Sequence, residues 1–249
     1  MVRRILCCLG GAVGGLFVGL LAPYVFHAYY EFPIGLGFCA LVTAVVVFAR
    51  ALSVKPRAPR YWMQAGIAIM VVFLAGYFYI LGSVMYQMTD GYRVVTRNFY
   101  GQLRVLDDGN PRIDDDAARR LIRGAINHGQ QMLREEYRRL PVTYFCPESG
   151  IGRGMKAQEG HPRRIGILGV GCGTLAAYGL PGDTLCIYEI NPLVLGIARR
   201  EFTYLKDTPA KVEVALGDAR LVLESESSVA RPDAPRGSDY GVLGCGAAK

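Results

Sequence analysis

Three closely spaced glycines, Gly169, Gly171 and Gly173, are the first residues whose spacing could do chemistry. They end an apolar run at 165–170, which predicts a buried parallel strand. Glycines at that point let the chain turn sharply and let a ligand approach the backbone closely. The GxGxG spacing lacks the last glycine of GxGxxG, so it fits a site for S-adenosylmethionine-type nucleosides better than a site for NAD.

Two further apolar runs end in acids. The run at 184–190 carries Glu189 near its end. The run at 211–218 ends in Asp218, and Ala219 follows. A carboxylate at the tip of the second strand can accept hydrogen bonds from both ribose hydroxyls of a nucleoside. Three such strand tips predict one crevice for one nucleoside. The alternative is that the glycines only form turns, that Glu189 begins a helix and that Asp218 caps one.

The elements that position these residues follow a membrane segment. The chain has 249 residues and is 51% hydrophobic, and its apolar excess lies in residues 1–88. Three stretches there, at 5–24, 33–51 and 61–85, are each long enough to cross the hydrocarbon of a bilayer. We therefore expect about three transmembrane helices and a lipid bilayer as partner.

Small residues recur at every fourth position of the first span, at Gly11, Gly15 and Gly19. This spacing gives a helix a flat face for close contact with another helix. The face predicts a partner helix or a homodimer.

The loops bear on topology, because short cytoplasmic loops are rich in Lys and Arg. By this rule the N-terminus and the second loop are cytoplasmic, and three spans then put the remainder outside the cell. Nucleoside cofactors are cytosolic, so we expect a multi-pass protein of the cell membrane with its soluble part in the cytoplasm, which requires a missing or miscounted helix. The alternative is that the soluble part lies outside the cell. The basic residues concerned are Arg3, Arg4, Arg50, Lys55, Arg57 and Arg60.

Other compositional features exclude some functions. Much of the net charge of +7 comes from Arg and Lys beside the membrane spans, so it does not indicate nucleic-acid binding. The seven Cys residues form no CxxC motif. The adjacent carboxylates of Asp114, Asp115 and Asp116 have poor geometry for a cation and fit a turn. We expect no metal site.

The soluble region begins with alternating apolar and polar residues at 92–106, which predict a half-buried pair of antiparallel strands or one long bent strand. One more strand is expected at 118–126, short helices at 149–158 and 192–202, and a disordered or aberrant tail after Glu224. The predicted fold is an α-helical transmembrane segment plus an α/β region. This region is a small antiparallel β-subdomain (89–147) followed by an incomplete Rossmann-like, methyltransferase-type domain (148–224), and then the tail (225–249).

Three segments, 97–101, 121–131 and 141–145, together with the glycine-rich core, resemble the spermidine synthase family. The membrane segment also resembles members that carry transmembrane spans ahead of the synthase domain. The resemblance covers roughly residues 5–224.

This resemblance implies transfer of an aminopropyl group from decarboxylated S-adenosylmethionine, as co-substrate, to a small-molecule diamine in polyamine biosynthesis. The three glycines match the nucleoside loop, Glu189 the acid that holds the ribose, and Asp218–Ala219 the pair that meets the adenine. A polar strand end that faces the cleft in the family matches Asn127, His128 and Gln131. Family members are often dimers.

Some residues depart from the family pattern. Cys172 stands where many members carry Asp in the glycine loop, and Arg123 stands where His or Asp is expected. The family's acidic loop follows a fourth strand, and no such strand is evident after Glu224. We therefore expect the chain as written to be inactive or unstable. The alternatives are a methyltransferase-like enzyme that uses S-adenosylmethionine, and a non-catalytic membrane protein that binds a nucleoside or polyamine.

Overall fold

The computed structural model describes residues 2–53, 60–228 and 240–244. The chain divides into two compact units. The membrane unit comprises Met1–Gly91 and Arg97–Phe99, and the soluble unit comprises Tyr92–Thr96 and Tyr100–Lys249.

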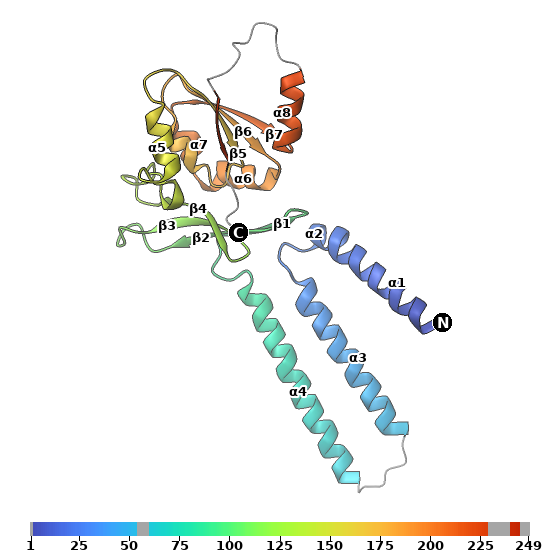
Figure 1. Cartoon of the computed structure of the whole chain (residues 1–249). Coiled ribbons are helices and arrows are strands. Elements are labelled where there is room, and N and C mark those ends of the chain that lie inside the picture. The colour runs from blue at the N-terminus through green and yellow to red at the C-terminus, as the bar shows by residue number, and fades with distance from the viewer. Residues whose placement is uncertain (1, 54–59, 229–239, 245–249) are drawn as a thin grey trace. The chain divides into compact units, whose positions relative to one another are not determined.

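Long apolar helices form the membrane unit (Figure 1). The first, α1 (Val2–Leu16), continues through a π-helical turn at Phe17–Leu21 into α2 (Ala22–Val25). The others are α3 (Glu31–Ser53) and α4 (Arg60–Gln87). Three stretches are long and apolar enough to cross a membrane, Cys8–Val25, Glu31–Arg50 and Met63–Gln87. At most 11% of each stretch is buried within the protein, which leaves its apolar side chains free to face lipid.

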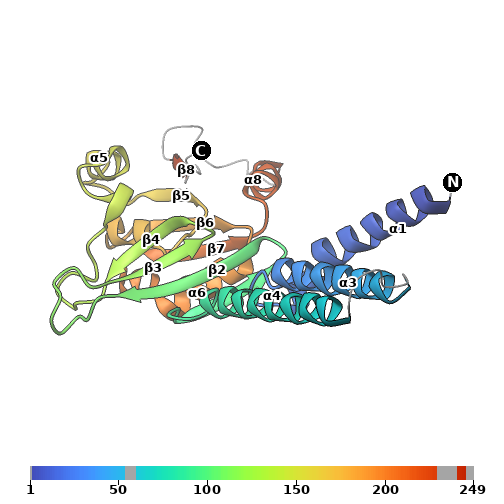
Figure 2. The ribbon, with the colours of Figure 1, turned by 90° about the horizontal axis from the view of Figure 1, so that it is seen from below.

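The helices α3 and α4 lie side by side (Figures 1 and 2). Gly37 permits this approach, because a Cβ atom there would lie 3.0 Å from the Phe78 ring and 3.4 Å from Leu81. By contrast, no described atom lies within 4 Å of a Cβ built on Gly11, Gly15 or Gly19. A partner helix on that face stays a prediction.

An antiparallel sheet with strand order β1-β2-β3-β4 comes next in the chain. The last two residues of β1, Arg97 and Asn98, belong to the membrane unit, and the rest of the sheet belongs to the soluble unit. Its strands are β1 (Val94–Asn98), β2 (Gly101–Asp108), β3 (Ala118–Arg123) and β4 (Ile126–Met132). The single strand expected at 118–126 is wrong. A turn at Gly124, with φ +61°, divides that stretch into a hairpin and places Ile126 opposite Arg123.

A parallel sheet with strand order β7-β6-β5-β8 forms the second half of the soluble unit. The first strand, β5 (Arg164–Leu168), lies in the interior of the sheet next to β6 (Thr184–Glu189), and β7 (Lys211–Leu216) lies at the edge. Five of the six β6 residues are buried, as expected of a parallel strand covered on both faces. The helices are α5 (Gly150–Ala157), α6 (Pro192–Glu201), α7 (Tyr204–Asp207) and α8 (Ala219–Ser228). An α/β region is thus present, and α5 and α6 confirm the short helices expected at 149–158 and 192–202.

The tail differs from expectation. Helix α8 extends to Ser228, and β8 (Tyr240–Gly244) pairs in parallel with β5, from Arg164↔Tyr240 to Leu168↔Gly244. The expectation that no further strand follows Glu224 is therefore wrong. The reason is that a five-residue run with two glycines in it carries little periodicity, and it pairs because β5 offers a free edge. The remainder of 225–249 lies outside the described residues.

Both halves of the soluble unit share one hydrophobic core. Leu103 and Val105 of β2 and Leu121 of β3 belong to the same cluster of buried side chains as Ile165 and Ile167 of β5. Since burial of each such side chain contributes on the order of 2 kcal/mol, the two sheets stabilise each other. The shared core holds β4 beside the loop that follows β5.

Candidate functional site

The glycine loop after β5 explains why glycine stands at each of its three positions. Gly169, Gly171 and Gly173 have φ of +86°, +54° and +89°, values that other residues rarely adopt. A Cβ on Gly171 would lie 3.2 Å from the His128 carbonyl oxygen, and one on Gly173 would lie 3.1 Å from Leu205. A Cβ on Gly169 would meet nothing within 4 Å. Two glycines therefore serve close contact within the fold, and Gly169 borders open space.

Glu189 ties this loop to the end of the central strand. Its side chain is buried, with 6% of the residue exposed. One carboxylate oxygen accepts a hydrogen bond from the Val170 N–H at 2.9 Å, and the other accepts one from the Asn191 N–H at 2.8 Å. The Gly217 N–H donates to the Glu189 carbonyl oxygen at 2.9 Å. The ends of β5, β6 and β7 therefore meet at Glu189.

The geometry also decides between two interpretations of Glu189. Helix α6 begins at Pro192, and its cap is Asn191, whose side-chain oxygen accepts from the Leu193 N–H at 3.1 Å. Glu189 ends the strand, so the interpretation of it as a helix-initiating residue is wrong. A carboxylate has about four acceptor positions, and the two N–H groups leave further positions for a ligand's hydroxyl groups.

Asp218 lies at the third strand end and is exposed. Its Oδ1 accepts from the Arg220 N–H at 2.9 Å, so it caps α8, whose first residue is Ala219. The interpretation of Asp218 as a helix cap is confirmed, and contact of this pair with an adenine stays a prediction.

Strand β4 passes directly beside the glycine loop. A Cβ on Gly129 would fall 2.5 Å from the Cys172 sulfur, so only glycine fits there. Asn127 turns its side-chain oxygen back onto the Gly129 N–H at 3.0 Å, and its carbonyl oxygen accepts from the Tyr144 hydroxyl at 3.4 Å. Asn127 and His128 thus lie in the part of β4 that adjoins the loop.

Gln131 has a structural role within the fold. It is buried, its Oε1 accepts from the Thr203 N–H at 2.9 Å, and its Nε2 donates to Thr203 Oγ1 and to the Arg138 carbonyl, both at 2.8 Å. Its amide thus joins β4 to the segment after α6. The geometry gives no sign of the ligand contact that was predicted for it.

The electrostatic setting of His128 keeps its imidazole neutral near pH 7. Burial lowers the pKa of His128, and the positive charge of Arg123 lowers it further. Arg123 is exposed and donates to the Tyr100 carbonyl oxygen. A neutral imidazole can accept a proton or a hydrogen bond, whereas the nearby guanidinium disfavours a cationic ligand.

Tyr204 packs against the glycine loop at Gly173 and was not predicted from the sequence. Tyr204 is buried, and its hydroxyl donates to the Leu140 carbonyl at 2.7 Å and to the Gln130 carbonyl at 3.2 Å. Burial and the neighbouring Cys172 raise the pKa of Tyr204, so its phenol stays protonated. The aromatic residue type was visible in the sequence, but its acceptors lie 64 and 74 positions away.

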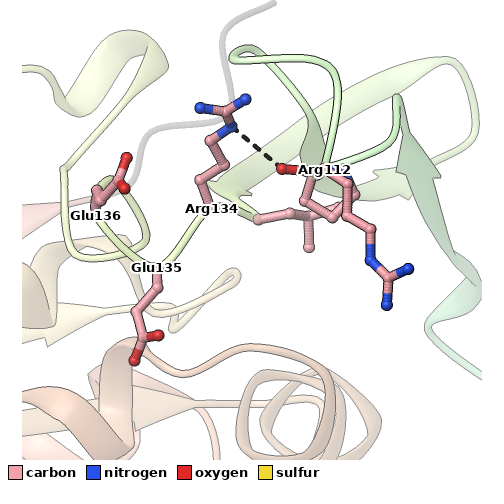
Figure 3. Close-up of a pocket in the computed structure, with 6 residues that line it drawn as sticks. Arg112, Arg134, Glu135 and Glu136 are labelled. Atoms are coloured by element: carbon pink, nitrogen blue, oxygen red, sulfur yellow. Dashed lines mark hydrogen bonds between the residues drawn. The ribbon is translucent and has the colours of Figure 1, made fainter.

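A shallow hollow of about 390 Å³ lies elsewhere in the soluble unit (Figure 3). Its lining residues are Pro111, Arg112, Leu133, Arg134, Glu135 and Glu136. Arg134 donates to the Pro111 carbonyl at 3.2 Å and pairs with Asp115 at 2.5 Å. The lining charges are mixed, and Arg134 is already held by Pro111 and Asp115, so this hollow is a weaker candidate than the strand ends.

Comparison of the chain with protein-family models, with curated proteins and with solved structures gives no match. Within 2–53, 60–228 and 240–244 there is no group of three or more His, Cys, Asp or Glu side chains that could hold a metal ion. The candidate site therefore stands on its own geometry.

Proposed function

We propose that the soluble unit binds a nucleoside of the S-adenosylmethionine type at the carboxyl ends of β5, β6 and β7. The chain would then be a membrane-anchored protein of the aminopropyltransferase type. One observation carries this proposal: the buried Glu189 carboxylate is held by two N–H groups beside a glycine loop that leaves space at Gly169. Ligands of open α/β sheets bind at this end of the strands.

The site residues would have distinct roles. Glu189 would accept hydrogen bonds from the ribose hydroxyls, and the open side of Gly169 would admit the substituent on the ribose. His128 would be the neutral base that takes the proton a diamine must lose before it attacks the sulfonium donor. Decarboxylated S-adenosylmethionine would be the co-substrate, and the transferred group an aminopropyl chain.

A second candidate is binding of a nucleoside without transfer. It is favoured by Arg123, whose positive charge acts on His128 at the position where a diamine, itself a cation, would have to approach. A transferase would instead place a carboxylate there, because a carboxylate attracts the substrate. Transfer of a methyl group is a third outcome that the same assay detects.

The test uses the full chain, purified in detergent or nanodiscs, and calorimetric titration. We expect binding of methylthioadenosine and of decarboxylated S-adenosylmethionine, and weaker binding of S-adenosylmethionine, whose carboxylate the aminopropyl donor lacks. Incubation with putrescine then separates transfer from binding alone by mass spectrometry. No binding of any of the three nucleosides by the wild-type chain would reject the proposal.

A matched pair of variants assigns the site. Gly169→Ala and Gly182→Ala both put a side chain at positive φ, +86° and +93°, without a contact shorter than 3.4 Å. Each should lose about 1–2 kcal/mol of stability from backbone strain. Only Gly169→Ala should also lose nucleoside affinity, because its methyl group would occupy the open space. Equal affinities of the two variants would place the ligand elsewhere.

A further inference from the structure

Arg97 makes a buried contact within the membrane unit. Its Nη1 and Nη2 donate to the two carboxylate oxygens of Glu31, each at 2.8 Å, and Nη1 also donates to the Ala28 carbonyl at 3.1 Å. The Arg97 and Glu31 side chains are only 6% and 9% exposed. The guanidinium carbon lies 4.2 Å from the centre of the Tyr29 ring. Strand β1, which follows α4 in the chain, is thus fixed through Arg97 to Ala28 and to Glu31, the first residue of α3.

This contact constrains topology. The hydrocarbon of a bilayer is about 30 Å thick, so two segments joined by a buried ion pair lie on one face of it. The segment before α3 and the chain after α4 are therefore on the same face, and α3 and α4 cross as a hairpin. The end of α3 and the start of α4 lie on the opposite face, whatever precedes α1.

Exposed aromatic side chains also place these segments at one membrane–water interface. Tyr24 of α2, Phe32 at the start of α3, Tyr86 near the end of α4 and Phe99 after β1 are between 65% and 82% exposed. Trp and Tyr gather where a protein passes from hydrocarbon to water. These residues mark one interface shared by the same segments that the Arg97 pair joins.

The basic residues then assign the two faces. The segment 26–30 contains no Arg or Lys, whereas Arg50 lies in the last turn of α3 and the sequence 54–60 holds three more basic residues. Short cytoplasmic loops carry this excess. We infer that the end of α3 and the start of α4 face the cytoplasm and that the soluble unit lies on the opposite, non-cytoplasmic face. An additional upstream helix does not reverse this result, because α3 and α4 alone set the relation.

This orientation does not depend on nucleoside binding, and it limits which ligands can reach the site. A site on that face has no direct access to cytosolic S-adenosylmethionine or its decarboxylated form. If both proposals hold, the ligand is a nucleoside thioether outside the cytoplasm, and binding without transfer is the expected activity. The soluble unit would then be non-cytoplasmic, contrary to the expectation from the sequence.

Labelling of introduced cysteines tests the orientation in the full chain. Ser53→Cys at the end of α3 and Asp116→Cys in the soluble unit are both at exposed positions, and neither touches the Arg97 pair. Spheroplasts of a bacterial host are treated with a membrane-impermeant maleimide, and modification at each position is read by peptide mass spectrometry. We expect Asp116→Cys to react in intact spheroplasts and Ser53→Cys to react only after permeabilisation. The reverse pattern, or reaction of both in intact spheroplasts, would overturn the inference.

A second measurement tests the contact itself. Arg97→Met leaves Glu31 buried without its partner, so hydrogen exchange of 26–31 should rise. The double variant Arg97→Met with Glu31→Leu replaces both charges by apolar groups and should return the exchange toward the wild-type level. Unchanged exchange in Arg97→Met would show that the ion pair does not hold these segments together. Nucleoside binding to detergent-purified protein does not depend on either result, so the two proposals can fail separately.

Discussion

The two ends of strand β6 each carry a buried carboxylate, and the two carboxylates differ in their hydrogen-bond partners. Asp183 directly precedes the strand and is 2% exposed, and Glu189 ends it and is 6% exposed. Asp183 faces the guanidinium of Arg163, with Nη2 and Oδ2 2.5 Å apart. Glu189 faces two backbone N–H groups, and no cation forms an ion pair with it among the described residues. The amino end of the sheet is closed, and the carboxyl end keeps acceptor capacity that a ligand can use.

Nearly every donor and acceptor at the amino end is satisfied within the fold. Arg163 also donates to the carbonyls of Met155 at 2.7 Å and Tyr178 at 3.0 Å, and Asp183 accepts from the Leu180 N–H at 2.9 Å. Burial tends to raise the pKa of Asp183, but the hydrogen bonds from Arg163 and the backbone, with the Arg163 charge, outweigh it and lower the pKa. The carboxylate of Asp183 is thus paired with a cation inside the fold, whereas that of Glu189 accepts from backbone N–H groups alone.

The largest effect is expected from Asp183→Ala. It leaves the Arg163 guanidinium buried without a counter-ion, and loss of one partner of a buried pair costs about 3–5 kcal/mol. Thermal unfolding of the purified chain, followed by circular dichroism of the strands, measures the change. A loss below that of an ordinary surface substitution would show that the amino end is not closed as described.

The double variant Arg163→Met with Asp183→Leu is the control, because it removes both charges and should recover much of the stability. The pH profile gives an independent check. A folded-state pKa below the unfolded value of 3.8 means that stability is present above pH 3.8 and is lost as pH falls through the lower folded pKa. This acid-side loss should shrink in Asp183→Ala.

Glu189→Gln comes next in size. The amide replaces one acceptor oxygen by an NH₂ group, which must face the N–H of Val170 or of Asn191, so a cost of about 1–3 kcal/mol is expected. Nucleoside binding should weaken together with stability. Glu213→Gln on β7 is the control, since that carboxylate is partly exposed and lies away from the glycine loop. If Glu189→Gln keeps wild-type affinity, the carboxyl end is also only structural.

The sequence was sufficient for the features that depend on neighbours in the chain. Apolar length predicted the three long helices, and the ends of β5 and β6 follow from their apolar runs and glycines. The Arg163–Asp183 pair was not predicted, because it depends on the parallel register Arg164↔Thr184, which no local pattern specifies. The task of Gln131 likewise depends on Thr203, 72 positions away. Strand β8 was missed because a five-residue run forms a strand only when another strand offers it an edge.

Alkaline pH should produce a smaller effect at the amino end. The Tyr178 carbonyl accepts from Arg163, and the Tyr178 hydroxyl donates to the Phe145 carbonyl at 2.5 Å. Burial, with the negative charges of Cys146 and Glu148 nearby, raises the pKa of Tyr178 from 10.0 to about 12. The neutral phenol therefore contributes stability that is fully present below pH 10 and is lost as pH rises through about 12.

Tyr178→Phe tests this dependence. At pH 8 the variant should lose about 1 kcal/mol, because the Phe145 carbonyl loses its donor. Between pH 10 and 12 its stability should fall less than that of the wild type, and the remaining fall reflects the raised pKa of Tyr204. Unfolding at a series of pH values provides the measurement, with Tyr137→Phe, at an exposed position, as control. Parallel pH curves for the wild type and Tyr178→Phe would contradict the prediction.

The smallest effect is expected from Asp218→Asn, and it decides how far the open end extends. Asn caps a helix about as well as Asp, so the hydrogen bond to the Arg220 N–H persists and stability should change by no more than about 0.5 kcal/mol. If Asp218 only caps α8, nucleoside affinity is unchanged as well. A tenfold loss of affinity at unchanged stability would instead show that the Asp218 carboxylate contacts the ligand, because loss of a helix cap alone would not weaken binding. The end of β7 would then belong to the site. Calorimetric titration of this variant beside Glu189→Gln therefore distinguishes a site formed by two strand ends from one formed by three.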